Sequence, residues 1–341
     1  MTLRLSPKLL GLAVLAAVLI GLPHLLSFSQ QEVAVFLVLN VVMVVSYRLV
    51  TLTGEWSLIH VVLQGVGAYA TALLATHAGV PVLLSIPLAA GVAAFLAYVL
   101  SFPLFRLKAF SFLIGSFAAG EAIRLSWKYF DGVFGGSQGI SLIPPIPDLG
   151  PISFFSAVNF YYLVVIVATI SLLILHRVEH SRIGLIFHAI HWHDNLAAST
   201  GINVRYYRTL AFVIASFFAG LTGALTAHYM GTVVPSEFSV DHMLFVVIWV
   251  IVGGINTSYG PILGVVLLTV VNEVVLRGIG MDAARPLFYG VILILTMLFL
   301  PSGLDSLVER GRQALRDRWG WRGPQVRIGA TGAPKSEEAA E

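Results

Sequence analysis

The most regular feature of the chain is a series of long apolar stretches separated by short polar or Gly- and Pro-rich breaks. A membrane-spanning helix needs about 20 apolar residues, with some latitude for tilt. By this criterion the sequence predicts ten spans, at residues 9–28, 33–50, 57–77, 82–104, 109–128, 159–176, 208–230, 241–257, 260–276 and 285–300. The expected fold class is therefore all-α, a polytopic transmembrane helical bundle.

Composition agrees with this pattern. Of the 341 residues, 57% are hydrophobic and 11% are charged, whereas soluble domains carry about 25% charged residues. So few charges cannot cover a water-facing surface, and we expect most of the outside to contact membrane lipid. The net charge of +3 does not indicate nucleic-acid binding, because the basic residues lie at span ends and in the tail. The chain has no cysteine, which excludes disulfides and thiolate metal sites.

The first apolar stretch has two interpretations. Arg4 and Lys8 precede an apolar run that begins at Leu9, as in a secretory signal peptide. The run continues past Pro23, however, and no A-x-A-like cleavage site follows it. A first membrane span is the preferred interpretation.

Three segments are too polar for lipid. Residues 131–157 are Gly- and Pro-rich and predict a long external loop, since no Lys or Arg occurs between Tyr129 and Leu175. Residues 177–207 combine apolar periodicity near 3.6 with several Arg and His residues, which predicts a short amphipathic helix on the cytoplasmic side. Residues 305–341 predict a cytoplasmic, partly disordered tail after a membrane domain at 1–304. Both termini are thus expected in the cytoplasm, and the breaker-rich residues 253–261 form either a full turn or a re-entrant one.

Motifs of nucleotide-hydrolysing, metal-dependent and serine enzymes are missing from the sequence. Five of the ten histidines fall between His176 and His193, and a pair such as His188 and His191 shares one helix face. No acidic ligands accompany them, so interfacial contacts are favoured over a metal site. We expect no cofactor, no metal and no catalysis by this chain.

Charged residues within predicted spans are more informative, because burying a charge in hydrocarbon is costly. Glu121 and Arg124 are three residues apart in the fifth span and can pair on one helix face. Glu273 lies near the end of the ninth span. Each is either a polar element of a translocation path or a structural group satisfied within the bundle.

Several motifs, in order along the chain, resemble those of branched-chain amino acid transporter permeases. W-S-L-I-H at 56–60 and G-V-G-A-Y at 65–69 resemble the family's S-L-G-H and G-x-G-A-Y segments, and G-E-A-I-R-L at 120–125 resembles G-E-I-I-R-L. Further matches are the Gly-rich 135–140, the small and apolar residues of 189–204, the turn at 253–264 and P-S-G-L at 301–304. The long external loop resembles that of the M-type subunit.

This resemblance implies a permease that works with a second permease subunit, two ATP-binding subunits and an external solute-binding protein in the bacterial inner membrane. It would move branched-chain amino acids or a related small polar solute. The residues expected to form the path or its packing are Ser57, Gly65, Gly67, Tyr69, Glu121 and Arg124. Those expected to couple to the ATP-binding subunit, through an amphipathic helix lying in its groove, are Gly184, Ala189, Ile190, Asp194, Ala198 and Gly201.

The chain also departs from the family pattern. Residues 191–194 read H-W-H-D where the family has R-E-D-E, and Glu55-Trp56 replaces a small-residue pair. These changes leave the solute and the partner subunits open. Two other functions remain as alternatives: an ion-coupled secondary transporter, which would need buried acid or His relays, and a membrane enzyme acting on a lipid-linked substrate.

Overall fold

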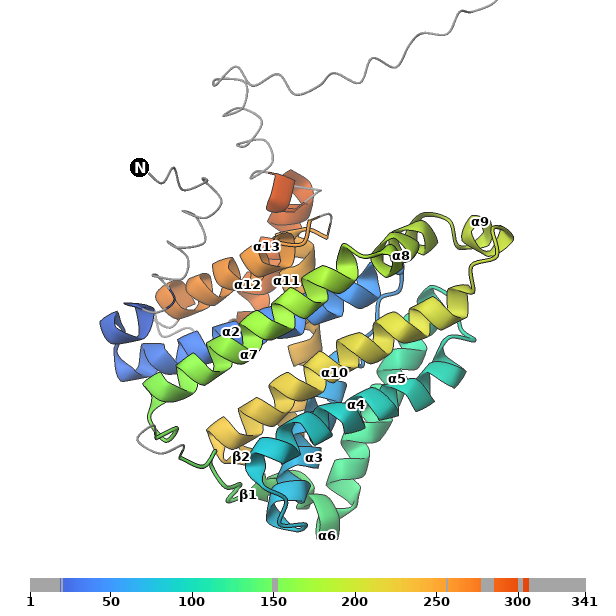
Figure 1. Ribbon diagram of the computed structural model, residues 1–341. Helices are drawn as coiled ribbons and strands as arrows, with labels where there is room; N and C mark the ends of the chain where they lie inside the picture. The colour runs from blue at the N-terminus through green and yellow to red at the C-terminus, as the bar shows by residue number, and fades with distance from the viewer. Residues whose placement is uncertain are drawn as a thin grey trace, which may run out of the picture.

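The computed structural model describes residues 19–306, except 20, 149–152, 256, 277–284 and 300–302 (Figure 1). Its long helices follow the predicted spans from 33–50 onward and confirm the all-α fold class. The first predicted span, at 9–28, lies largely outside the described residues, and the predicted tail does so from residue 307. The long helices are α2 (Phe28–Thr51), α3 (His60–Thr76), α4 (Val82–Leu104), α5 (Phe110–Tyr129), α7 (Ala157–Glu179), α10 (Val204–Met230), α11 (Val240–Gly253), α12 (Gly260–Val270) and α13 (Arg285–Phe299).

Four of these helices, α2, α4, α7 and α10, are long and apolar enough to cross a membrane by length and composition. The apolar helices α3, α11, α12 and α13 are shorter, and α12 is continued by the π-helix η3 (Val271–Leu276). The protein is therefore a multi-pass membrane protein.

Short elements occupy the two polar segments between the spans. In the predicted external loop, α6 (Asp131–Phe134) and the 3-10 helix η1 (Gly136–Gln138) lead into β1 (Ile140–Ser141). This strand pairs antiparallel with β2 (Thr232–Val233), Ile140 opposite Val233, and the 3-10 helix η2 (Pro235–Phe238) follows β2. The predicted cytoplasmic helix is two helices, α8 (Arg182–Trp192) and α9 (Asp194–Ser199).

Side-chain caps explain where the helices at this segment begin. The Ser181 hydroxyl accepts from the Ile183 amide at 3.2 Å at the start of α8. The Asn203 side chain accepts from the Tyr206 amide at 3.1 Å, so α10 begins at Val204 rather than at the predicted residue 208. Ser and Asn are favoured at these positions because they satisfy amides that have no partner within the helix.

The core is built around α10, which packs on α2, α3 and α4. One face of α10 carries small buried residues four apart, and α4 presents a matching series of buried alanines. Small residues let membrane helices approach closely, and dispersion contacts then hold them together. The residues of the two series are Ala211, Ala215, Ala219, Gly223 and Ala227 on α10, and Ala89, Ala90, Ala93 and Ala97 on α4.

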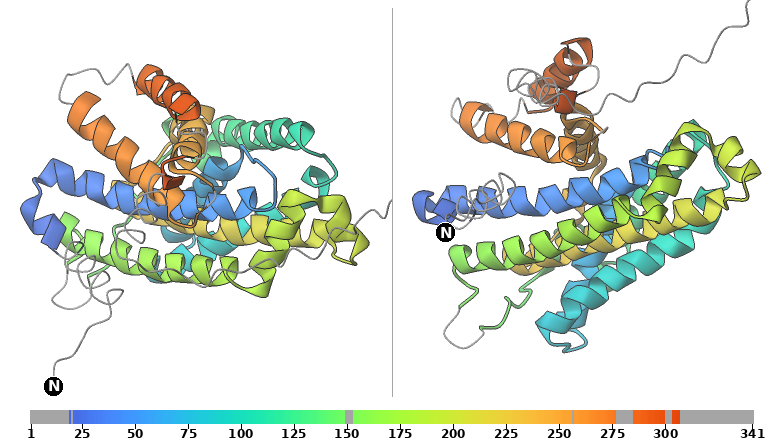
Figure 2. Two further views of the ribbon diagram at one scale, coloured as in Figure 1. Left: turned by 90° about the horizontal axis from the view of Figure 1, so that it is seen from above. Right: turned by 45° about the horizontal axis from the view of Figure 1, so that its top comes forward.

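The helices are arranged in layers about α2. The right-hand view of Figure 2 shows α12 on one side of α2 and α7 on the other, in agreement with the contacts of α2 with both helices. Helix α11 packs against α12 and α13. Helix α5 is sparsely covered, since only Phe112, Ser116, Gly120 and Trp127 of its 20 residues are buried.

The two polar segments lie at opposite ends of the bundle (Figure 1). Helix α10 starts beside α9 and ends beside β2, and its 27 residues extend about 40 Å at 1.5 Å per residue. That length exceeds the ~30 Å hydrocarbon core of a bilayer. After the roles that the sequence predicts for these segments, we call the end with α8 and α9 the coupling end and the end with β1 and β2 the outer end.

Candidate functional site

The glycines expected at the path pack helices together. A Cβ at Gly67 would collide with the backbone of Gly220 on α10, so α3 and α10 cross with their main chains in contact. A Cβ at Gly65 would lie 2.6 Å from the Trp127 ring and 2.7 Å from the Phe238 ring. Of the two roles foreseen for these glycines, packing is the one visible in the geometry.

Tyr69 and Ser57 are also buried. The Tyr69 ring stacks on Trp127 with centroids 4.6 Å apart and meets the edge of Phe134 at 5.7 Å. Trp127 thus lies against both Gly65 and the Tyr69 ring, in an aromatic cluster between α3, α5 and the outer loops. Ser57 is fully buried, and among the described residues its hydroxyl has no hydrogen-bond partner.

Glu121 and Arg124 form the ion pair that their spacing predicts. Arg124 Nη2 lies 2.7 Å from Glu121 Oε2, and Arg124 Nε donates to Glu121 Oε1 at 3.0 Å. Such two-point pairs fix the geometry of both side chains. Their side chains are 20% and 16% exposed, respectively, so the pair lies at the edge of the face of α5 that the rest of the chain leaves uncovered.

The third charged residue expected within the spans, Glu273, lines a cavity of about 390 Å³ between α2, α11, η3 and α13. Its walls include the polar side chains of Asn40, His242 and Asn272. The acid of the ninth predicted span therefore lines a partly polar cavity, in keeping with the usual placement of ionisable groups in membrane proteins.

In the coupling segment, the structure separates buried from exposed positions. Gly184 is buried, and a Cβ there would collide with the carbonyl oxygen of Glu179. Ile190 is 1% exposed. The Ile190 side chain therefore packs inside the bundle, because the apolar stripe containing it faces the other helices, and its expected role in coupling stays a prediction. Ala189, Ala198 and Gly201 are exposed.

Arg208 ties three parts of the coupling end together. Its Nη1 lies 3.2 Å from Glu55 Oε1 and its Nη2 lies 3.8 Å from Asp194 Oδ2. Glu55 is 3% exposed, and burial raises the pKa of its carboxyl while Arg208 acts in the opposite direction. Asp194, an expected coupling residue, thereby connects α9 to the start of α10.

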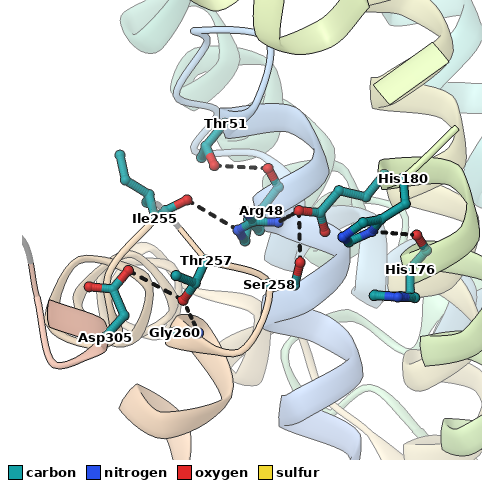
Figure 3. A network of polar contacts seen from close by, with 10 residues as sticks. Arg48, Thr51, His176, His180, Ile255, Thr257, Ser258, Gly260 and Asp305 are labelled. Atoms are coloured by element: carbon teal, nitrogen blue, oxygen red, sulfur yellow. Dashed lines mark hydrogen bonds and ion pairs between the residues drawn. The ribbon is translucent and has the colours of Figure 1, made fainter. Parts of the chain in front are cut away.

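A second polar network joins α2, α7 and the turn between α11 and α12 (Figure 3). Arg48 is 2% exposed, and its Nη1 lies 2.6 Å from Glu179 Oε1. Arg48 Nε also donates to the Ile255 carbonyl at 3.3 Å, and Ser258 Oγ donates to Glu179 Oε1 at 2.9 Å. In the same turn Thr257 Oγ1 donates to Asp305 at 3.3 Å.

Sequence reasoning did not identify this network. In the sequence Arg48 is only one of the basic residues at span ends, and no motif contains Glu179. The partners come from separate helices, and no short-range spacing connects them. The single available signal was a carboxylate at the end of an apolar span in a chain with few acids.

The histidine cluster makes contacts with the backbone. His191 Nδ1 donates to the Thr51 carbonyl at 3.2 Å, and His180 Nδ1 to the His176 carbonyl at 3.0 Å. Burial lowers the pKa of His188. Within the described residues, no three His, Asp or Glu side chains lie together in a way that could hold a metal ion.

These features define a helical, multi-pass membrane protein with a polar, ion-paired coupling end. The family model described as branched-chain amino acid transport system / permease component matches residues 29–300, most of the chain, and the protein belongs to this family of transport permease components.

Two curated relatives support this assignment. The high-affinity branched-chain amino acid transport system permease protein LivM of Escherichia coli (strain K12) is 26% identical, over 99% of this chain and 80% of the relative. The LivM protein of Salmonella typhimurium (strain LT2) is 27% identical, over 86% of this chain and 74% of the relative. No solved structure matches the chain.

Proposed function

We propose that this chain is the permease subunit of an ATP-binding cassette importer that moves branched-chain amino acids, or a related small polar solute, across the bacterial inner membrane. The proposal includes a second permease subunit, two ATP-binding subunits and an external solute-binding protein as partners. Family membership supports the transport role, and the observation that carries the coupling role is an exposed apolar surface on α8 and α9.

That surface, which we call the docking surface, consists of Leu185, Trp192 and Leu196, which are 69%, 74% and 62% exposed. Ala189 and Ala198 are exposed on the same two helices and permit close approach. Large apolar side chains gathered on one surface mark contact sites with other proteins. We propose that the ATP-binding subunit covers the docking surface, with Trp192 in place of the acidic residue that the family pattern has there.

Placing a charge in the docking surface tests this proposal. We expect Leu196→Asp to lower co-purification of the ATP-binding subunit by a factor of about ten or more, because the carboxylate would be buried without a partner. The permease should still insert and retain its melting temperature. The matched control is Leu142→Asp at the outer end, where Leu142 is 93% exposed. Equal co-purification of both variants with wild type would contradict the assignment of the docking surface.

Helix α5 offers the best candidate for the translocation path. Ionisable side chains within membranes face a bundle interior or a water-filled cavity, whereas the Glu121–Arg124 pair lies beside a face that this chain leaves uncovered. We propose that the second permease subunit covers this face and that the pair borders the path between the two subunits.

Single and paired charge changes test the role of this ion pair. We expect Glu121→Gln to reduce solute uptake by at least about tenfold by leaving Arg124 unpaired, and the exchange Glu121→Arg with Arg124→Glu to restore part of it. Uptake into proteoliposomes is the measurement. Lys128→Gln, one turn further along α5 at an exposed position, should transport normally. Full uptake by Glu121→Gln would show that the pair is incidental.

The distribution of basic residues supports one orientation. Arg106, Lys108, Arg177 and Arg182 are exposed at the coupling end, and Lys and Arg are absent from Phe130 to Leu175. Because basic loops stay in the cytoplasm, we propose that the coupling end is cytoplasmic, together with both termini, and that residues 131–157 face the outside.

A further inference from the structure

Both the start and the far end of helix α8 are linked to the last turn of α2. At its start, the missing side chain of Gly184 lets α8 sit directly on the main chain of Glu179, whose carboxylate pairs with Arg48. At its far end, His191 donates to the Thr51 carbonyl at 3.2 Å. A displacement of α8 therefore acts on the last turn of α2 at two points.

The same ion pair also holds the turn between α11 and α12. Arg48 donates to the Ile255 carbonyl and Glu179 accepts from Ser258, so each partner of the pair contacts this turn once (Figure 3). The helices α11 and α12 run antiparallel, and their backbones touch where Gly253 meets Gly260. Gly254 has a φ of 100°, a conformation that side chains disfavour, and the tight turn keeps the two helices together.

A buried ion pair often contributes little net stability to the folded protein. Desolvation of both charges offsets much of their attraction, and apolar residues of the same size often serve as well. The position of this pair suggests a different use, because α7, α2 and the α11–α12 turn all meet at it, and α8 lies on the main chain of Glu179.

We propose that Arg48 and Glu179 are positioning residues that transmit movement of α8, imposed by the ATP-binding subunit, to the α11–α12 turn. This inference rests on the proposed function, in which α8 carries the docking surface. A shift of α8 pulls the Glu179 carboxylate, which holds both the Arg48 guanidinium and the Ser258 hydroxyl. The α11–α12 hairpin then moves with the coupling helix instead of staying behind in the bundle.

The ratio of solute imported to ATP hydrolysed tests the proposal. The tagged complex would be purified with its ATP-binding subunits, reconstituted in proteoliposomes with its solute-binding protein, and supplied with a labelled mixture of leucine, isoleucine and valine. We expect Glu179→Gln to retain assembly and ATP hydrolysis but to lower the ratio about tenfold, as expected from loss of a charge-assisted contact. Ser258→Ala should lower the ratio about two- to fivefold, through loss of one neutral-donor hydrogen bond.

If Glu179→Gln fails to assemble, Ser258→Ala still tests the proposal, because the Ser258 variant leaves the Arg48–Glu179 ion pair intact. Its matched control is Ser199→Ala on α9, where the hydroxyl bonds to the carbonyl of its own helix at Leu196. Partial restoration of the ratio by exchanging the charges, Arg48→Glu with Glu179→Arg, would separate transmission from simple folding. If Ser258→Ala kept the wild-type ratio of solute imported to ATP hydrolysed, the role of the ion pair in transmission would be wrong and the proposed function would stand. Failure of the wild-type complex to import any of the three amino acids with ATP would overturn the proposed function with it.

Discussion

Replacing Gly67 by alanine is expected to destabilise the protein by about 3 kcal/mol or more, the upper end of the range for overpacked interiors. The added Cβ would collide with the backbone of Gly220, and a main chain cannot rotate away as a side chain does. Gly220 in turn lies against Ala93 and Ala90 of α4, so α4 blocks any movement of α10 away from α3. The crossing of α3 and α10 would have to open, with loss of contacts along both helices.

The measurement is the apparent melting temperature of the detergent-purified protein, followed by tryptophan fluorescence. Gly91→Ala is the matched control, since a Cβ at that position in α4 meets nothing within 4 Å. This control should be neutral or slightly stabilising, because alanine favours helix more than glycine does. Equal melting temperatures for Gly67→Ala and Gly91→Ala would mean that the two helices do not cross this closely.

Replacing Arg208 by methionine is expected to cost about 3–5 kcal/mol, the range found when one partner of a buried ion pair is removed. Glu55 is 3% exposed, and its second carboxylate oxygen has no hydrogen-bond partner among the described residues. Without Arg208 the carboxylate would be buried and unpaired. Methionine keeps most of the apolar stem, so the charge is the principal change.

This loss should depend on pH. Burial already raises the pKa of Glu55 and Arg208 lowers it, so removing Arg208 raises that pKa further. A carboxyl group with a higher pKa in the folded state favours folding at low pH, and this contribution disappears as pH rises through the folded-state pKa. The deficit of Arg208→Met should therefore shrink as pH falls from about 8 toward 5, closer to the ordinary Glu pKa.

Two further variants separate charge from packing. Adding Glu55→Gln to Arg208→Met should restore much of the melting temperature, because no unpaired charge remains. Arg205→Met is the matched control, since Arg205 is exposed on the same helix and donates to the Phe102 carbonyl. A deficit that is independent of pH, and that Glu55→Gln does not relieve, would show that Arg208 acts through packing alone.

The helices of this protein could be predicted from sequence because the bilayer fixes their length. The fourth span was expected at 82–104, and α4 covers Val82–Leu104. Helix α10 starts four residues before the predicted span because Arg205 falls in the polar segment 177–207 of the sequence. The sheet of β1 and β2 could not be foreseen, since strands of two residues show no alternation.

The candidate site was predictable where partners are close in sequence. Glu121 and Arg124 were expected to pair because residues three apart share a helix face. The burial of Ile190 could not be predicted, because the apolar stripe of an amphipathic helix can face the bundle as well as a partner, and periodicity does not distinguish the two. The Arg48–Glu179 pair depends on how α2 and α7 pack, which no local pattern encodes.

The buried Arg48 also constrains how the chain enters the bilayer. Arg48 lies in the last turn of α2, but Glu179 is synthesised only after α3, α4 and α5, at the end of α7. Until then the guanidinium has no carboxylate from Glu179, and an unpaired arginine within hydrocarbon is costly. We therefore expect the end of α2 to remain hydrated at the membrane surface during biogenesis, and Arg48 to become buried only when α7 has been inserted beside it.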